Sequence, residues 1–201
     1  MVKILKFDNE EDWMDARLTR VTGTRKIMPK RGTAKLDGFY DLIGERLLKQ
    51  GYGKSSFQIG TEREPEAIER FEKETGKEVD STKQLFTRED NDYISISPDG
   101  GKIKGEKSSL EIKCFSVGKH IKAFLTKEMP SEYEHQKLQY FVVDDELEKL
   151  YVGFYNPDLY VHDFFYLTFT REELKFEIAE YLEFQRKTLE EIDKIEEKLI
   201  T

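Results

Sequence analysis

The chain has little of the residue types that cross-link small domains or bind zinc. Its 201 residues include one cysteine, Cys114, and three histidines, His120, His135 and His162. A single cysteine excludes an intrachain disulfide framework and a Cys-rich metal cluster, and a reducing cytoplasm fits this composition. The histidines are too scattered for a zinc-ligand pattern. We expect Cys114 to be a small core residue rather than a nucleophile.

Excess positive charge and long apolar runs are also absent. Asp and Glu number 41 against 33 Lys and Arg, so the formal net charge is −8. This charge argues against a protein that coats nucleic acid with a generally basic surface. A local basic stretch between residues 17 and 35 fits either DNA contact or a solvated loop. No apolar run is long enough to span a bilayer, and the N-terminus is too short and charged for a signal peptide. We therefore expect a cytoplasmic protein that does not enter a membrane.

The chain reads as one domain, residues 1–201, because it shows no repeat, linker or low-complexity tract. Apolar residues at helical spacing predict helices over 36–48, 61–75, 120–125, 131–142 and 172–199, with a helix start at 9–12. Strand patterns occur at 84–87, 93–97, 109–114, 150–155 and 160–168. This order predicts an α/β (mixed α+β) fold, in which helices flank a central mixed sheet and the last helix is long.

One pair of segments points to chemistry: the turn Ser97-Pro98-Asp99-Gly100 and the run Leu110-Glu111-Ile112-Lys113-Cys114. In a strand, Glu111 and Lys113 point to one face and their apolar neighbours to the other. A charged pair on a buried strand is costly unless a partner or a function compensates. Two carboxylates and a lysine are what a metal-dependent phosphodiester hydrolase needs: the carboxylates hold Mg²⁺, and the lysine orients a water beside it.

A third carboxylate, Glu64, has several interpretations. It precedes Ala67 and Ile68 by three and four residues, so it shares their inward helix face. It also fits a capping box with Thr61, or the edge of a solvated acidic face. The sequence leaves these alternatives open.

Pro98-Asp99 with Glu111-Ile112-Lys113 fills the signature of the PD-(D/E)XK nuclease superfamily, whose core is restriction-endonuclease-like. The surrounding residues resemble the phage lambda-type exonucleases, the YqaJ-like nucleases of viral recombination systems. Five motifs match in order over most of residues 13–140: Trp13-X-X-X-Arg17-Leu18 with Thr22 and Thr24; Gly60-X-X-X-Glu64-X-X-Ala67; Ser97-Pro98-Asp99-Gly100; Leu110-Glu111-Ile112-Lys113-Cys114; and Tyr133-X-X-Gln136.

The resemblance implies a catalytic role for each matching residue. Asp99 and Glu111 would hold a catalytic Mg²⁺, for which Mn²⁺ would substitute, with the Ile112 carbonyl as a further ligand. Glu64 would contact the metal directly or through water. Lys113 would position the attacking water and stabilise developing charge.

Two further groups of residues receive roles from the same resemblance. Gln136 would orient the substrate or the lysine, and Arg17, with Thr22 or Thr24, would hold the 5′-phosphate of a DNA end, a task that suits the arginine fork. Gln136-X-X-X-Tyr140 also fits the QxxxY pattern of RecB-like nucleases, although the chain lacks the cysteine set of their iron–sulfur members.

The implied function is a Mg²⁺-dependent 5′→3′ double-strand DNA exonuclease. It would act as a ring-shaped homotrimer encoded by a phage or prophage in a bacterial host, and it would make 3′ single-stranded tails for a strand-annealing partner. The alternatives are an endonuclease on the same fold and a DNA-binding module with a degenerate site. The lysine-rich segment from Gly101 to Ser109 fits either DNA contact or a solvated hairpin.

Overall fold

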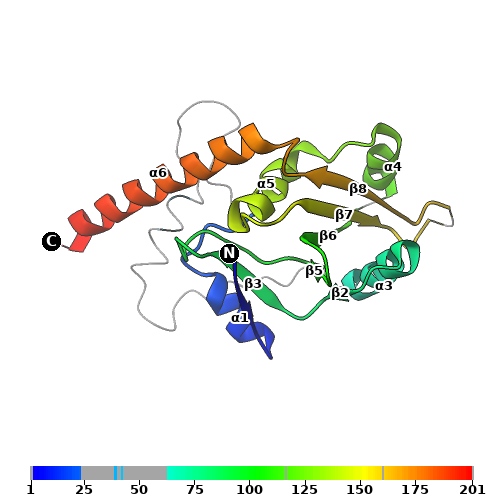
Figure 1. Cartoon of the computed structure of the whole chain (residues 1–201), viewed down its shortest axis with the longest axis horizontal. Coiled ribbons are helices and arrows are strands. Elements are labelled where there is room, and N and C mark those ends of the chain that lie inside the picture. Colours follow the sequence, from blue (N-terminus) through cyan, green and yellow to red (C-terminus); the bar gives the residue numbers. More distant parts are fainter. Residues whose placement is uncertain are drawn as a thin grey trace.

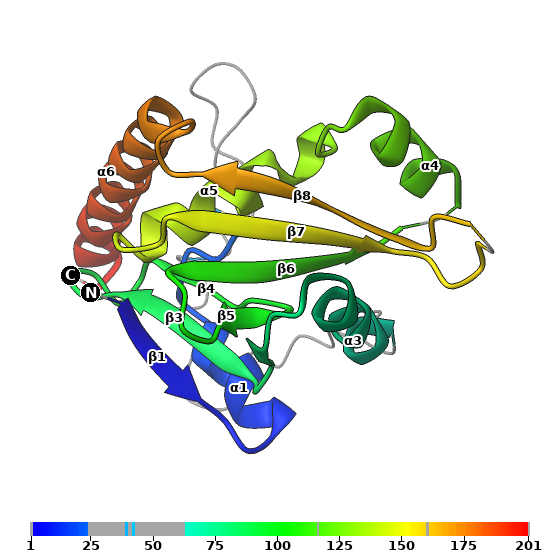
Figure 2. The same cartoon turned by 45° about the vertical axis from the view of Figure 1, so that its right-hand side comes forward.

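The computed structural model describes residues 2–23, 39, 42, 63–115, 117–159 and 161–200. Within these residues the strands form two sheets, which lie side by side in Figure 2. The smaller sheet has the order β1-β3-β4, and its strands are antiparallel: β1 (Val2–Lys6), β3 (Gln84–Arg88) and β4 (Ser95–Ile96). The larger sheet has the order β2-β5-β6-β7-β8: β2 (Val79–Asp80), β5 (Gly101–Ile103), β6 (Ser108–Cys114), β7 (Lys149–Tyr155) and β8 (Phe164–Thr170).

The larger sheet is mixed, because β6 and β7 are parallel and its other pairs are antiparallel. Helices cover both of its faces (Figure 1). The described helices are α1 (Glu10–Arg17), α3 (Glu64–Thr75), α4 (Val117–Thr126), the 3-10 turn η2 (Ser131–Tyr133), α5 (Glu134–Val143) and the long α6 (Lys175–Ile200). These elements confirm the expected class, a mixed α/β fold with a long C-terminal helix.

The alternation along β6 decides what each face of the sheet carries. Leu110 and Ile112 pack with Phe71 of α3 in one apolar cluster. Glu111 and Lys113 are also buried, but they point to the opposite face, where α5 lies. The charged pair therefore lies inside the molecule, under a helix.

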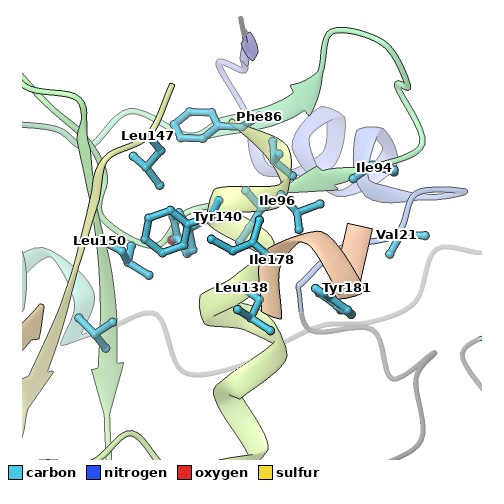
Figure 3. Packing of buried hydrophobic residues seen from close by; sticks show 14 of the residues in the cluster. Val21, Phe86, Ile94, Ile96, Leu138, Tyr140, Leu147, Leu150, Ile178 and Tyr181 are labelled. Carbon is cyan, nitrogen blue, oxygen red and sulfur yellow. The ribbon is translucent and has the colours of Figure 1, made fainter. Parts of the chain in front are cut away.

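Helix α5 is the centre of the larger apolar cluster. Figure 3 shows it between the strand that carries Leu150 and the two segments that carry Val21 and Ile94, with Ile178 and Tyr181 of α6 packed against it. Every residue of α5 from Gln136 to Val143 is buried. Because burial on all sides leaves no solvated face, the polar residues of this helix must find partners inside the protein.

Several boundaries differ from the sequence expectations. The strands β1, β2 and β5 were not predicted, and β2 and β5 are too short to show a period. The predicted strand 160–168 begins instead at Phe164, after a turn in which the amide of Asn156 donates to the carbonyl of Asp163. The predicted helix 36–48 lies outside the described residues except for Phe39 and Leu42, both helical and buried.

The lysine-rich segment after Gly101 is a hairpin whose charges are paired. Gly101 to Ile103 form β5, antiparallel to β6, and the lysines pair with acidic side chains: Lys102 with Asp144, Lys104 with Glu78 and Lys107 with Glu148. These pairs favour the hairpin interpretation. None of the described helices is long and apolar enough to cross a bilayer.

Candidate active site

A tight turn brings Asp99 next to β6. The amide of Gly100 donates to the carbonyl of Leu110 at 3.2 Å, and the amide of Asp99 lies 3.4 Å from Glu111 Oε2. A Cβ atom on Gly101, whose φ is +99°, would lie 2.1 Å from the carbonyl oxygen of Asp80. Only glycine fits there, and this close approach fixes the turn that places Asp99 beside Glu111.

Lys113 joins the two carboxylates. Its ammonium donates to Asp99 Oδ2 at 3.1 Å, to Glu111 Oε1, and to the carbonyl oxygen of Ile112 at 3.1 Å. Asp99 is half-buried, and the other two side chains of this group are buried. The structure thus brings together four groups that the sequence assigned to one site: Asp99, Glu111, Lys113 and the Ile112 carbonyl.

Glu111 has two more partners, both from α5. Gln136 Nε2 donates to its Oε1, and the Tyr140 hydroxyl donates to its Oε2. Gln136 was expected to orient the substrate or the lysine, and the contact that the structure gives it is with Glu111. No role for Tyr140 was inferred from the sequence, and the available signal was its four-residue spacing from Gln136. Residues four apart lie on one helix face, so both reach the same carboxylate.

Charge and burial oppose each other at this cluster. Burial, followed by the charge of Asp99, raises the pKa of Glu111, while Lys113 and the Tyr140 hydroxyl act in the opposite direction. Burial alone would lower the pKa of Lys113, but the flanking carboxylates of Glu111 and Asp99 outweigh it and raise that pKa. Lys113 is therefore held as a cation, which is the form that can stabilise negative charge.

Glu64 borders the same cluster. Burial, with the nearby charge of Asp99, raises the pKa of Glu64 to about 7, while Lys113 and Lys83 act to lower it. Helix α3 begins at Glu64 with Arg63 as its N-cap residue. Glu64 thus occupies the first helical position, whereas a capping box needs the third. Glu64 therefore does not have the position of a capping-box residue in α3, and Thr61, its expected partner, lies outside the described residues.

The donors at this site are oxygens, which suit Mg²⁺ or Mn²⁺. The oxygens of Asp99, Glu111 and Ile112 already share one cation, the Lys113 ammonium. Within the described residues, no three His, Cys, Asp or Glu side chains form a preformed metal cluster. The donor set fits a divalent cation by its chemistry, and Glu64 is close enough to add charge.

Helix α1, which carries Arg17, is joined to the segment before the Asp99 turn. The guanidinium of Arg17 stacks over the Trp13 ring, 4.6 Å from its centroid, and Lys83 lies 5.4 Å from the same ring. Trp13 Nε1 and Ser97 Oγ both donate to the carbonyl of Gln84, at 3.3 and 3.2 Å. This shared carbonyl ties α1 to the turn that carries Asp99.

The segment after α1 also reaches the site. Thr22 is buried, and a Cβ atom on Gly23 would lie 3.1 Å from Cγ of Gln136. The stretch that carries Thr22 therefore packs on the helix that contacts Glu111. Thr24 lies outside the described residues.

The side chains that we expected to be structural have structural surroundings. Cys114 packs against the α3 cluster, and burial raises the pKa of its thiol to about 11. His135 stacks on Tyr181, and Nε2 of the buried His120 lies 2.8 Å from the carbonyl oxygen of His162. None of these groups touches the carboxylate cluster through a described contact.

Comparison with known proteins shows what this architecture is similar to. An alkaline exonuclease (LHK-Exo) from Laribacter hongkongensis has a TM-score of 0.77 and 27% sequence identity, with 95% of this chain and 98% of that chain covered. The same enzyme in complex with dAMP gives 0.76 and 28%, with the same coverage. A phage related exonuclease from Haemophilus somnus 129PT shares the fold, at a TM-score of 0.57 and 17% identity over 90% of this chain and 96% of that one. No curated protein matches the chain.

A family model, that of the YqaJ-like viral recombinase domain, matches residues 12–145. The match extends from α1, with Trp13 and Arg17, to the end of α5, and it includes every residue assigned above to the carboxylate cluster. It covers more than half of the chain and confirms the resemblance drawn from the motifs. The chain belongs to the YqaJ-like viral recombinase domain family.

Proposed function

We propose that this protein is a Mg²⁺-dependent exonuclease that degrades one strand of duplex DNA from its 5′ end. Membership of the YqaJ-like family and likeness to alkaline exonucleases support a DNA exonuclease role. The observation that carries the proposal is the convergence of Asp99, Glu111 and the Ile112 carbonyl on the Lys113 ammonium. A hydrolase of phosphodiesters needs oxygen ligands and a fixed positive charge at one point.

The chemistry divides between the metal and the protein. A bound Mg²⁺ would supply Lewis acidity and neutralise charge on the scissile phosphate. Asp99, Glu111 and the Ile112 carbonyl would hold it, with Glu64 at the border. Lys113, kept cationic by its carboxylate neighbours, orients the attacking water and stabilises the charge that develops on the phosphate oxygens.

Recognition of a 5′ end would rest on Arg17. Its guanidinium is stacked on Trp13, and Lys83 adds a second positive charge at the same ring. A terminal phosphate monoester carries between about −1.5 and −2 charges, more than an internal diester. The positive charge of Arg17 would therefore select ends with a 5′-phosphate, and Thr22 and Thr24 would add hydroxyl donors.

We also propose the biological setting that the family implies. The enzyme would be encoded by a phage or prophage, and its 3′ single-stranded tails would be the substrate of a strand-annealing protein. A ring-shaped trimer around the duplex would explain how one strand stays threaded during digestion. The complex of LHK-Exo with dAMP, a deoxynucleoside monophosphate, agrees with products released one nucleotide at a time.

The second candidate is an endonuclease on the same fold. The carboxylate cluster alone favours neither, since internal and terminal phosphodiesters are cleaved by the same chemistry. The position of Arg17 favours the exonuclease, because α1 is tied to the catalytic turn through the Gln84 carbonyl.

The test compares linear with covalently closed duplex DNA, in Mg²⁺ and in EDTA. Linear duplexes labelled at the 5′ or the 3′ end report the polarity, and the Asp99→Asn variant serves as the control for contaminating nucleases. We expect Mg²⁺-dependent release of mononucleotides from the 5′ ends, no cutting of circles and no activity in Asp99→Asn. Rapid cutting of closed circles would establish the endonuclease instead.

A further inference from the structure

A buried amide on α5, that of Gln139, holds the segment that follows α1. Gln139 is fully buried, and its Nε2 atom donates to the carbonyl of Val21 at 3.1 Å and to that of Ser95 at 2.9 Å. Its Oε1 atom accepts from Nε2 of Gln185 on α6. The side-chain amide thus connects three parts of the chain that are distant in sequence.

The chemistry of the partners fixes the orientation of this amide. Backbone carbonyls only accept hydrogen bonds, so the NH₂ group of Gln139 must face Val21 and Ser95. The same two residues are joined by the amide of Ser95, which donates to the carbonyl of Val21 at 3.0 Å. Gln139 therefore holds together the backbone at Val21, which continues into Thr22, and the backbone at Ser95, which continues toward Ser97.

The next residue along the helix, Tyr140, contacts the carboxylate cluster instead of the segment after α1. Its hydroxyl donates to Oε2 of Glu111. Successive side chains on a helix are about 100° apart, which is why Gln139 and Tyr140 reach different partners.

Figure 3 shows the geometry that this requires: α5 lies between the sheet strand with Leu150 and the segment with Val21. We propose that α5 fixes the position of the DNA-end-binding segment relative to the residues that cleave the phosphodiester. Gln139 is the positioning residue for the Val21–Gly23 segment, and Tyr140 is the positioning residue for Glu111. This inference rests on the proposed function, since it assumes that the segment next to Thr22 contacts the DNA end.

A merely structural role predicts a different pattern. Two buried polar residues that only stabilise the fold would lower the melting temperature, and they would change end recognition and metal binding together or not at all. Two positioning residues would each change one property. A displacement of about 1 Å in a binding geometry costs up to about 100-fold in rate, and loss of an outer partner of a metal ligand weakens metal affinity by about 10- to 100-fold.

The Gln139 arm of the experiment measures the preference for 5′-phosphorylated over 5′-hydroxyl duplexes, as a ratio of initial rates and as a ratio of DNA affinities in Ca²⁺. Gln139→Met removes the amide at similar volume, and Gln185→Met removes its neighbour, which does not touch the segment. We expect Gln139→Met to lower the ratio by about tenfold and Gln185→Met to keep it. If Gln139→Met does not fold, Gln139→Asn retains an amide that is too short to reach, and we expect the same loss.

The Tyr140 arm measures Mn²⁺ binding to the DNA-free protein by calorimetry. Tyr140→Phe removes one hydroxyl, and Tyr181→Phe is the matched control in the same core. We expect about tenfold weaker Mn²⁺ binding in Tyr140→Phe alone, with the preference for phosphorylated ends unchanged. Equal effects of both α5 variants on both readouts overturn the proposal.

A wild-type enzyme that does not prefer 5′-phosphorylated ends would disprove both the proposed end recognition and the role of Gln139. The role of Tyr140 would still be decided by the calorimetry.

Discussion

The Nζ atom of Lys113 lies 3.1 Å from the carbonyl oxygen of Ile112, the residue before it in the same strand. The ammonium folds back along β6 and sits among the oxygens that the resemblance assigns to a metal. A metal ion held by the same oxygens would be repelled by this ammonium, so metal binding and the position of Lys113 are linked.

Replacement of Lys113 by Met should separate binding from chemistry. The carboxylates lose a competing cation, so we expect Mn²⁺ to bind the DNA-free protein more tightly than it binds the wild type. The single-turnover rate of cleavage should fall by at least about 100-fold, since the charge acts mainly on the transition state, while DNA affinity in Ca²⁺ stays nearly unchanged. Calorimetry and rapid-quench kinetics measure the two effects, and a near-normal cleavage rate would disprove the catalytic role.

Glu64 should make the stability of the metal-free protein depend on pH. The unfolded value of its pKa is 4.5 and the folded value about 7, so the folded state keeps a proton that the unfolded state loses between these values. The contribution of Glu64 to stability should therefore fall as the pH rises from about 4.5 to about 7 and change no further above that range. Urea denaturation of the wild type and of Glu64→Gln at several pH values tests this. The difference between the two proteins should grow across this window, and parallel pH profiles would contradict it.

The sequence predicted the convergence of Asp99, Glu111 and Lys113 better than it predicted the details of the fold around them. Asp99, Glu111 and Lys113 were found because their spacing is local: a turn, and alternation along one strand. The partners of Glu111 on α5 depend on tertiary packing, and only the Gln136 motif indicated one of them. The QxxxY spacing pointed to Tyr140 without giving it a role, and nothing in the sequence pattern distinguishes the polar role of Gln139 on a helix that is buried from Gln136 to Val143.

The division of the strands into two sheets could not be read from the sequence either. It depends on β1 joining β3 across more than 70 residues, since Lys6 pairs with Gln84 and Val2 with Arg88. The strands β2 and β4 have two residues each, too few for a periodic signal, and their pairing is decided by the close approach of Gly101 to Asp80 and by the bridge between Val21 and Ile94.

Arg88 should be a stabilising residue outside the site. It is buried, donates to the carbonyl of Val142 at the end of α5, and pairs with Asp90 and Asp145, both at 2.7 Å. Because both aspartates stay hydrated when it is removed, we expect Arg88→Met to cost about 2 kcal/mol of unfolding free energy, chiefly through the loss of these hydrogen bonds. Lys104→Met, which removes an exposed pair with Glu78, is the control and should leave the urea midpoint unchanged. Equal midpoints for the two variants would contradict the assignment.

Arg17 should decide between DNA ends. Its guanidinium carbon lies 4.6 Å from the centroid of the Trp13 ring, and the arginine fork matches the oxygens of a terminal phosphate. Arg17→Ala should reduce the initial rate on 5′-phosphorylated linear duplex more than the rate on 5′-hydroxyl duplex, so the ratio between them shrinks, by about tenfold for a charge-assisted pair. Arg186→Ala, which removes an exposed arginine of α6 paired with Asp90, is the matched control and should keep the ratio.

The alternative treats Arg17 as an ordinary helix-surface charge beside a tryptophan, and it predicts the same ratio in the wild type and in Arg17→Ala. That result, at unchanged thermal stability, would remove end recognition from α1 and favour an endonuclease.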